Sequence, residues 1–373
     1  MNYVYYSPVG HVVEALKFSK GIHAANPGIE IHVALNRCSP TELTEACPWI
    51  KKTYPIDIYE FLTKDSDPAC VKRVPRAWDY VMTNTLALCD IAAARTLGRD
   101  ERALGNYLRA SETLFRASMG TGRFFPKISF PDGLSYRFDA KVELQLPQHA
   151  IRFARRLDHA GPKMCLLLGG SGPYLAYPAI QTWIKIIRAL NDCFSNLRIY
   201  LTGVRKSKPG YTTTRGYTDD HIDRILRTFP NVVDCYDIGL WNQLAVVKQS
   251  DMFLSPHTGF GFLALCVDTP WLTISGGEWS EYFFNHIPFY SVLPDNPGYP
   301  NYCSPKRRRR GPRPRRIRDM DPHRLDKKIP EILHAARLLM SRSFTYQDAL
   351  KRHRQNARRA NVRHDRIHLG PIF

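Results

Sequence analysis

The sequence predicts an α/β fold made of two doubly wound domains. Strand-like and helix-like segments alternate in two separate stretches, and each stretch opens with a buried strand that runs into a turn containing glycine. Such alternation is typical of parallel sheets covered by helices on both faces. With 373 residues, the chain is long enough for two cores of roughly 150 residues each. We expect a first domain over 1–160, a second over 161–340 and a helical tail over 341–373.

The first domain is predicted to begin with a strand, a helix and a parallel strand. Asn2–Val9 alternates apolar and aromatic residues, His11–Ala25 repeats apolar residues at helical spacing, and Ile29–Leu35 is apolar again. A right-handed crossover makes the two strands parallel. Farther along, residues 78–118 have a helical pattern, and residues 120–136, which are rich in Gly, Pro and Phe, predict a long ordered loop.

The second domain is predicted to follow the polar break at Asp158–Pro162, which ends a helix over Leu146–Leu157. Strands and helices then alternate regularly. The predicted strands are Lys163–Leu168, Leu197–Thr202, Asn231–Cys235, Asp251–Leu254 and Pro270–Ile274. The predicted helices are Ile180–Leu190, Asp219–Phe229, Leu240–Gln249, Phe262–Cys266, Pro330–Met340 and Thr345–Ala360.

Composition favours a cytoplasmic protein. No apolar run reaches the roughly 18 residues of a membrane span. The segment Met1–Leu16 lacks the basic start and the small-residue cleavage site of a signal peptide. The nine cysteines include no Cys-x-x-Cys pair, which argues against a disulfide framework and against structural zinc.

The net charge of +19 is concentrated near the end of the chain. Residues 306–373 hold 21 Lys/Arg against 6 Asp/Glu, a net charge of +15, whereas residues 1–305 reach only +4. The run 306–318 (KRRRRGPRPRRIR) predicts a basic flexible loop. A nucleic-acid or polyanion binding protein that uses this run is therefore one alternative. The run has no aromatic residue for base stacking, so nucleic acid is not the expected partner, and contact with a membrane or another anionic surface stays open.

The strongest local signal is the turn Ser255–Gly261 (SPHTGFG), which lies between a short strand and a helix. Glycines let the backbone approach a ligand, and the start of a helix carries roughly half a positive charge on its free N–H groups. A pyrophosphate fits such a turn. The candidate ligands are His257, Thr258, Gly259, Phe260 and Gly261. The alternative is an ordinary strand-to-helix turn in which the glycines only relieve crowding.

Over most of the second domain the sequence resembles the bacterial heptosyltransferases, whose donor is ADP-heptose. The similar segments, in order, are LLLGGSGPYLAYPAIQTWIKIIRAL, IYLTG, NVVDCYDIGLWNQLAVVKQSDMFL and the Gly-rich turn with its following helix and Thr-Pro strand. The resemblance implies a GT-B fold, in which two Rossmann-like domains face each other across a cleft. It also implies a nucleotide-sugar site in the second domain, an acceptor site in the first, and last helices that cross back onto the first domain.

The donor loop departs from the family pattern. The family has Asp-Ser-Gly-x-x-His there, whereas this chain has Ser255–Gly259 (SPHTG), with no acid and with its histidine early. The resemblance therefore does not name the donor sugar.

GT-B enzymes commonly carry the base where the first strand passes into the first helix. Heptosyltransferase-like chains have Gly-Asp at this turn, whereas Gly10-His11 resembles the Gly-His dipeptide of other GT-B families, and this resemblance implies a catalytic base here. A histidine whose pKa is near neutrality can take the proton of an acceptor hydroxyl. We predict His11 as the base, while Glu14, one turn along, orients the ring or serves as the base itself. The alternative for His11 is a helix-start residue bonded to the backbone.

Further donor contacts are predicted at three turns of the second domain. Two residues in the turn after the first strand resemble the family's phosphate-facing turn. Cations after the second strand are expected to neutralise the leaving diphosphate, and an acid after a Gly-Gly pair is expected to accept from ribose or sugar hydroxyls. These residues are Ser171 and Gly172, then Arg205, Lys206 and Lys208, and finally Glu278. Arg205 is the preferred cation. A solvated charge run and a plain loop acid are the alternatives.

Together these features predict a glycosyltransferase that moves a sugar from a nucleotide-diphospho sugar to an acceptor hydroxyl or amine. The acceptor is a saccharide, a glycolipid or a secondary metabolite. Inversion is implied by the resemblance alone, and no metal or other cofactor is expected, since metal-independent GT-B enzymes do without an Asp-x-Asp metal site. A nucleotide-sugar epimerase on a similar scaffold is the second alternative.

Overall fold

The structure is a computed structural model, and it divides into two compact units. It describes residues 2–4, 9–56, 73–75, 79, 82–83, 134–135, 137, 139–170, 177–205, 214, 217–274, 285–293 and 322–359. The first unit is Met1–Leu144 with Cys303–Arg309 and His364–Phe373, and the second is Gln145–Tyr302 with Arg310–Arg363. The change of unit comes before the expected 160, because α7 (Gln148–Arg156) packs on α10 (Leu240–Gln249) of the second unit.

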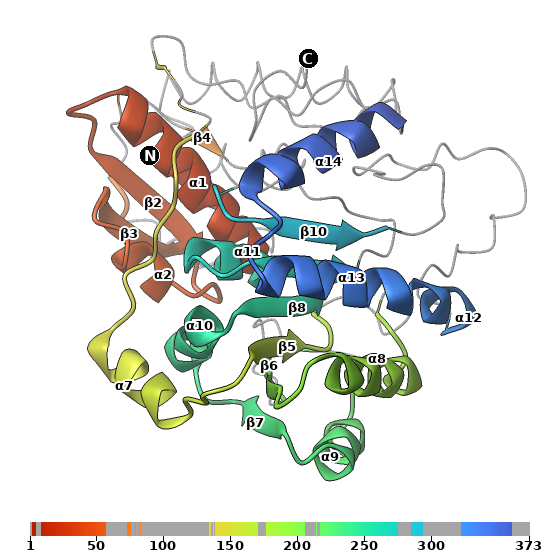
Figure 1. Cartoon of the computed structure of the whole chain (residues 1–373). Coiled ribbons are helices and arrows are strands. Elements are labelled where there is room, and N and C mark those ends of the chain that lie inside the picture. The colour runs from red at the N-terminus through yellow and green to blue at the C-terminus, as the bar shows by residue number, and fades with distance from the viewer. Residues whose placement is uncertain are drawn as a thin grey trace, which may run out of the picture. The chain divides into compact units, whose positions relative to one another are not determined.

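The described part of the first unit contains a parallel sheet in the order β3-β2-β1-β4. Its elements are β1 (Asn2–Val4), α1 (Val9–Ala25), β2 (Ile31–Asn36), α2 (Glu42–Glu45), β3 (Ile50–Ile56) and β4 (Met82–Thr83). The predicted strand–helix–strand beginning is confirmed (Figure 1). The helical prediction for 78–118 is wrong at Met82–Thr83, which pair with β1, and almost all of the rest lies outside the described residues.

Helix α1 is held by apolar burial on one side and by polar bonds on another. Val12, Val13 and Leu16 recur at helical spacing and are fully buried. The segment before the second unit runs along the helix, where Arg137 N–H donates to Gly21 O at 3.1 Å. The ammonium of Lys17, also fully buried, donates to Ala140 O in the same segment. Of the loop predicted over 120–136, only residues 134–135 are described.

The second unit contains a six-stranded parallel sheet in the order β10-β9-β8-β5-β6-β7. Its strands are β5 (Lys163–Leu167), β6 (Arg198–Gly203), β7 (Val232–Tyr236), β8 (Met252–Pro256), β9 (Trp271–Ile274) and β10 (Phe289–Val292). Its further helices are α8 (Ile180–Cys193), α9 (Asp219–Thr228), α11 (Gly259–Cys266), α12 (Pro322–Leu325), the 3-10 turn η2 (Asp326–Lys328), α13 (Ile329–Met340) and α14 (Tyr346–Arg359). Every strand predicted for this domain is confirmed, and β10 is an addition.

Helices cover both faces of this second sheet. Leucine and isoleucine side chains of β5, β6, β8 and β9 form one core with α8, α9 and α13. Helices α10 and α11 lie on the other face, and α7 packs on α10 (Figure 1). The result is the three-layer arrangement of a doubly wound domain, as predicted.

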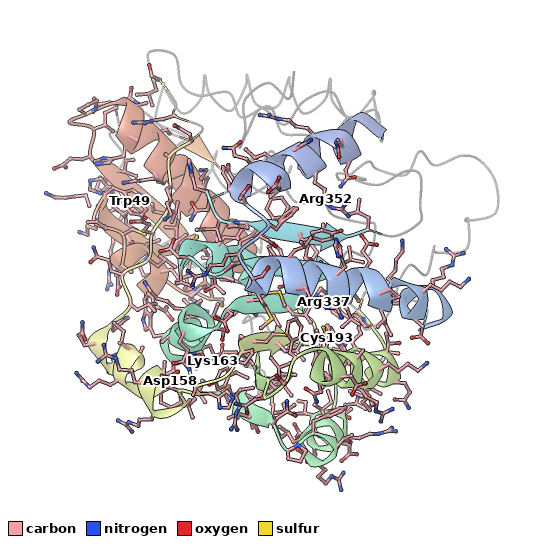
Figure 2. All side chains as sticks on the ribbon, viewed as in Figure 1. Trp49, Asp158, Lys163, Cys193, Arg337 and Arg352 are labelled. Carbon is pink, nitrogen blue, oxygen red and sulfur yellow. The ribbon has the colours of Figure 1, made fainter. Side chains whose placement is uncertain are left out.

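The C-terminal helix α14 belongs to the second unit and packs on β10. Arg352, labelled in Figure 2, donates to Ser291 O at 3.3 Å and to Glu331 Oε1 at 2.9 Å, and lies over the Tyr290 ring at 4.1 Å from its centroid. The expected crossing of the tail onto the first domain therefore stays a prediction for the residues after α14, which lie outside the described part. The basic run 306–318 lies outside it as well. Within the described helices, none is long and apolar enough to cross a bilayer.

Candidate functional site

The second sheet has its topological switch point between β5 and β8. From β5 the chain proceeds outward to β6 and β7, then crosses back to place β8 on the other side of β5. In open α/β sheets, ligands bind outside the carboxyl ends of the strands at this point, where the diverging connections leave a crevice. Sequence reasoning predicted the turn after β8 as a phosphate site, and the topology brings the end of β5 beside it.

Two turns meet at this switch point. A Cβ atom built on Gly170, after β5, would lie 3.0 Å from Thr258 Cγ2, after β8, and 3.1 Å from the Tyr177 hydroxyl. Such distances are shorter than ordinary van der Waals contact, so Gly170 is the residue that lets the two turns touch. The meeting of the turns is a property of the fold that no local pattern in the sequence shows.

Helix α11 begins at this contact. Thr258 is its N-cap, and its hydroxyl accepts from Gly261 N–H at 3.3 Å. The helix starts at Gly259 instead of the predicted Phe262, because capping and burial outweigh the poor helix propensity of glycine. The first turn of such a helix, which here contains no acidic residue, attracts an anion through its N–H groups and its dipole.

Gly261 serves packing. A Cβ atom there would lie 2.1 Å from Cζ2 of Trp271, whose ring fills the space beside the helix. The indole N–H of Trp271 donates to Ser255 Oγ at 3.0 Å, so the same side chain ties β9 to the end of β8. For Gly261, this packing fits the alternative that the glycine relieves crowding, and a contact with the donor stays a prediction.

His257 and Phe260 lie within aromatic clusters. The ring of His257 is edge-on to Phe262, with centroids 5.5 Å apart, and tilted against Trp271 at 5.8 Å. Its backbone N–H donates to Ile274 O at 3.2 Å. Phe260 lies against Phe253 of β8 at 5.6 Å between centroids. These contacts hold the turn in one conformation, and a direct contact of either side chain with the donor stays a prediction.

The turn after β5 is fixed by tyrosines that sequence reasoning missed. A Cβ atom on Gly169 would lie 2.9 Å from the rings of both Tyr177 and Tyr217. The Tyr217 hydroxyl lies 3.0 Å from Leu168 O and accepts from the indole N–H of Trp183 at 3.0 Å. The Gly-Gly pair at the end of a buried strand signalled a close approach, but nothing in the sequence pointed to the residues that make it.

Arg205 is surrounded by acids. Its guanidinium lies 2.6 Å from Asp234 Oδ2 and 3.6 Å from carboxylate oxygens of both Asp219 and Asp223, and it covers the Tyr236 ring at 5.2 Å from the centroid. Its charge is therefore balanced within the chain. A diphosphate at this turn would have to take the place of these partly exposed carboxylates, so the expected contact of Arg205 with the leaving group stays a prediction.

The other predicted residues can be placed only in part. His11 and Glu14 lie at the start of α1, which follows β1 at the switch point of the first sheet, where β2 and β4 flank β1. Their side chains are not among those described. Ser171, Gly172, Lys206, Lys208 and Glu278 lie outside the described residues.

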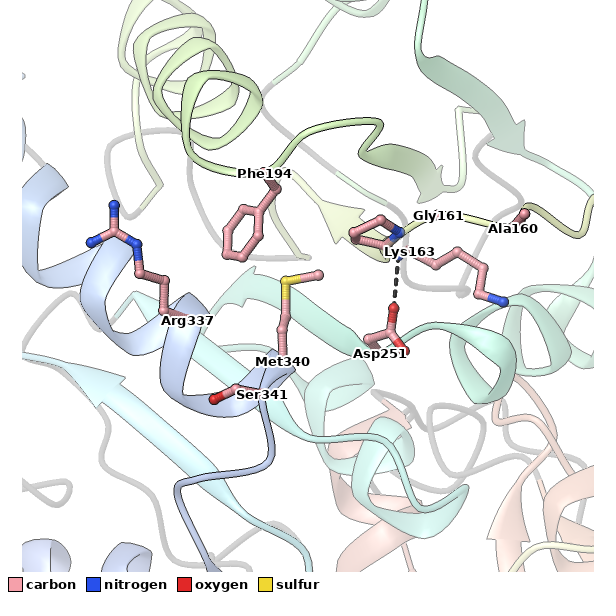
Figure 3. Close-up of a pocket in the computed structure, with 9 residues that line it drawn as sticks. Ala160, Gly161, Lys163, Phe194, Asp251, Arg337, Met340 and Ser341 are labelled. Carbon is pink, nitrogen blue, oxygen red and sulfur yellow. Dashed lines mark hydrogen bonds between the residues drawn. The ribbon is translucent and has the colours of Figure 1, made fainter.

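A cavity of about 560 Å³ lies at the opposite, amino edge of the second sheet (Figure 3). Phe194 and Met340 line its apolar part, and Asp251 accepts from the backbone N–H of Lys163 at 2.8 Å. Arg337, at its rim, donates from Nε to Cys193 Sγ at 3.1 Å. None of the predicted site residues that the structure describes lines this cavity. In the described part of the chain, no cluster of three or more His, Cys, Asp or Glu side chains is suited to a metal ion.

Comparison with known proteins finds similar structures but no similar sequences. No family model matches the chain, and no curated protein matches its sequence. Solved structures do match it. ADP-heptose LPS heptosyltransferase II of E. coli has a TM-score of 0.53 at 12% identity, covering 89% of this chain and 98% of that one.

Two further solved structures agree. E. coli heptosyltransferase WaaC with ADP-2-deoxy-2-fluoro heptose has a TM-score of 0.53 at 14% identity, covering 89% of this chain and 99% of that one. A glycosyl transferase of family 9 from Veillonella parvula has a TM-score of 0.57 at 11% identity, covering 91% and 97%. At these identities the likeness concerns the fold. The chain has the α/β fold of the GT-B class and resembles the heptosyltransferases in structure.

Proposed function

We propose that the chain is a glycosyltransferase that moves a sugar from a nucleotide-diphospho sugar to an acceptor hydroxyl or amine. The observation that carries the proposal is the contact of Gly170 with Thr258 at the β5/β8 switch point, directly before the first turn of α11. It brings the turn after β5 against the start of α11, in a chain whose fold matches heptosyltransferases along nearly its whole length.

The donor diphosphate binds at the start of α11. Backbone N–H groups of Gly259 and Phe260 face the phosphates, and the helix dipole offsets part of the charge that develops as the diphosphate leaves. A glycine at 170 keeps the approach open, while Trp271 and Thr258 hold the turn rigid. Lys206 and Lys208 remain the predicted cations for the leaving group. Arg205 would join them only by leaving its carboxylates.

The acceptor is activated from the first unit. In a single in-line displacement, the acceptor oxygen attacks the anomeric carbon, the bond from that carbon to the diphosphate oxygen breaks, and the nucleoside diphosphate departs. His11 takes the acceptor proton, with Glu14 as its orienting partner or substitute. The proposed reaction is thus inverting and needs no metal. Placement of His11 at the start of α1, at the switch point of the first sheet, supports this assignment.

The nucleotide is best identified by binding. ADP is the first to test, since a solved structure of similar fold holds it, and UDP, GDP, dTDP and CMP follow because the donor loop differs from the heptosyltransferase pattern. One nucleotide at about 100 times its Kd should raise the unfolding midpoint of the full chain by about 5 °C. A chain stabilised by none of the five would contradict the proposal.

A turnover assay then separates a transferase from a nucleotide-sugar epimerase. With the stabilising nucleotide as its sugar conjugate, a transferase releases nucleoside diphosphate only when an acceptor is added. An epimerase converts the sugar nucleotide without any acceptor. Loss of transfer in His11→Ala, with nucleotide binding unchanged, is the expected result for the base, and unchanged transfer would reassign that role to Glu14 or to another group.

A further inference from the structure

Helix α7 of the second unit has one face made of arginine. Ala150 and Ala154 are buried on its other side, where the helix packs on α10 (Figure 1). Arg152, Arg155 and Arg156 are exposed. Because successive residues turn by about 100°, Arg152 and Arg156 point away from the two alanines and Arg155 lies at the rim of the same side. These three residues are called the arginine face of α7.

The charges of this face are not balanced by nearby acids. In the described part of the chain, no carboxylate lies within ion-pair distance of any of the three guanidinium groups, and α7 itself contains no Asp or Glu. The acid that follows the helix, Asp158, is already engaged by Lys163 at 2.9 Å. The free charge of α7 contrasts with Arg205, which has three carboxylates around it.

Apolar side chains border the arginine face. Ile151 and Phe153, on its two sides, are only half-buried. Guanidinium groups bind phosphates through paired hydrogen bonds and lose little hydration in doing so. A helix with a cationic face and apolar flanks is suited to the boundary between headgroups and acyl chains. A single-strand nucleic-acid site instead combines a basic groove with a row of stacking aromatics, and a convex helix of about 13 Å offers neither.

We propose that the arginine face of α7 docks the protein on an anionic phospholipid bilayer. Each Arg near an anionic leaflet strengthens binding about fivefold, so three together account for roughly a hundredfold. Whatever their placement, the net charge of +15 in residues 306–373 adds a long-range attraction of the chain to anionic bilayers. The proposal does not depend on the glycosyltransferase assignment.

The test is co-sedimentation of the full chain with phosphatidylcholine vesicles that contain about 30% phosphatidylglycerol, at about 50 mM salt. The variant R152Q/R155Q/R156Q should bind roughly a hundredfold more weakly than the wild type. The matched control R188Q/R224Q/R342Q removes three exposed arginines from other places in the second unit, and the same net charge, and should lose at most a few-fold. R152K/R155K/R156K keeps the charge and should keep most of the binding.

Thermal unfolding verifies that the variants fold, since exposed substitutions change stability by less than about 0.5 kcal/mol. Three results would overturn the proposal. They are equal losses in the α7 variant and the control, equal binding of the wild type to neutral vesicles, and a loss confined to binding of a single-stranded oligonucleotide.

Discussion

The turns after β8 and after β6 lie at the same edge of the second sheet and treat charge in opposite ways. Residues 257–261, after β8, contain no Lys, Arg, Asp or Glu, and their attraction for an anion comes from the backbone of α11. After β6, Arg205 is a full cation, but three carboxylates surround it. The comparison shows that a Lys or Arg residue after a strand does not by itself indicate an anion-binding site. The free backbone N–H groups at the N-terminus of a helix keep their partial positive charge, because side-chain ion pairs do not neutralise them.

The largest expected effect comes from filling the space beside Trp271. Gly261→Ala places a methyl group where the indole ring lies, 2.1 Å from Cζ2, and should lower the free energy of unfolding by about 3 kcal/mol. Gly239→Ala is the control: its Cβ meets nothing within 4 Å, and its φ of +85° costs about 1 kcal/mol. Urea unfolding measures both. A G261A protein as stable as the wild type would show that the β8 turn is not held by this packing.

The cap of α11 is tested by two equivalent substitutions. Thr258→Val and Thr218→Val each remove an N-cap hydroxyl, from α11 and α9, and each should cost about 1 kcal/mol of stability. Only Thr258→Val should weaken nucleoside diphosphate binding, by about tenfold, because only α11 starts at the proposed phosphate site. Titration calorimetry with the nucleotide found in the screen measures this. Equal affinities in the two variants would remove α11 from the site.

Tyr236, the last residue of β7, lies beside Arg205 and should make the stability of the second unit depend on high pH. Burial raises the pKa of Tyr236, whereas the unfolded chain ionises its tyrosines near pH 10. The unfolded state therefore releases the proton first, so this stabilisation is complete below about pH 10 and is lost as the pH rises. Between about pH 10 and 11 the wild type should lose about 1 kcal/mol more than Tyr236→Phe. If the free energy of unfolding had the same pH dependence in the two proteins, the Tyr236 hydroxyl would be exposed to water and not buried.

Arg205→Gln should have the smallest effect. The side chains of its partners are between 44% and 71% exposed, so the ion pairs are screened and contribute less than about 1 kcal/mol. Nucleotide affinity should change by less than about threefold, because the carboxylates already occupy the guanidinium. A tenfold fall in affinity would show that Arg205 leaves them for the diphosphate, as sequence reasoning predicted.

The sequence predicts the second sheet well, because its strands are buried on both faces and appear as continuous apolar runs such as Lys163–Leu168. Phe289–Val292 was missed because four residues carry too little pattern. Ile50–Ile56 was missed because exposed lysines and a proline interrupt it. The sequence predicts the start of α11 three residues too late, because glycine has a poor helix propensity. Packing of Gly261 against Trp271 favours the helical conformation there.

The sequence predicts the candidate site as single turns, and the site itself stays a proposal. Strand–turn–helix order identifies the turn at Thr258 and Gly259, because the N-cap signal is local. The partner turn at Gly170 and the acids around Arg205 are contributed by residues far away in the chain, and only the folded sheet brings them together. A local sequence pattern therefore indicates where a site could lie, whereas the topology of the sheet decides which distant residues surround it.

Hydrogen exchange of the backbone amides, with and without a saturating nucleoside diphosphate, tests the central claim most directly. The account predicts ligand-dependent protection at Gly259, Phe260 and Gly170, around the β5/β8 switch point, with no change at Asp234 and Arg205. Protection confined to the turn after β6, with none at the start of α11, would contradict it.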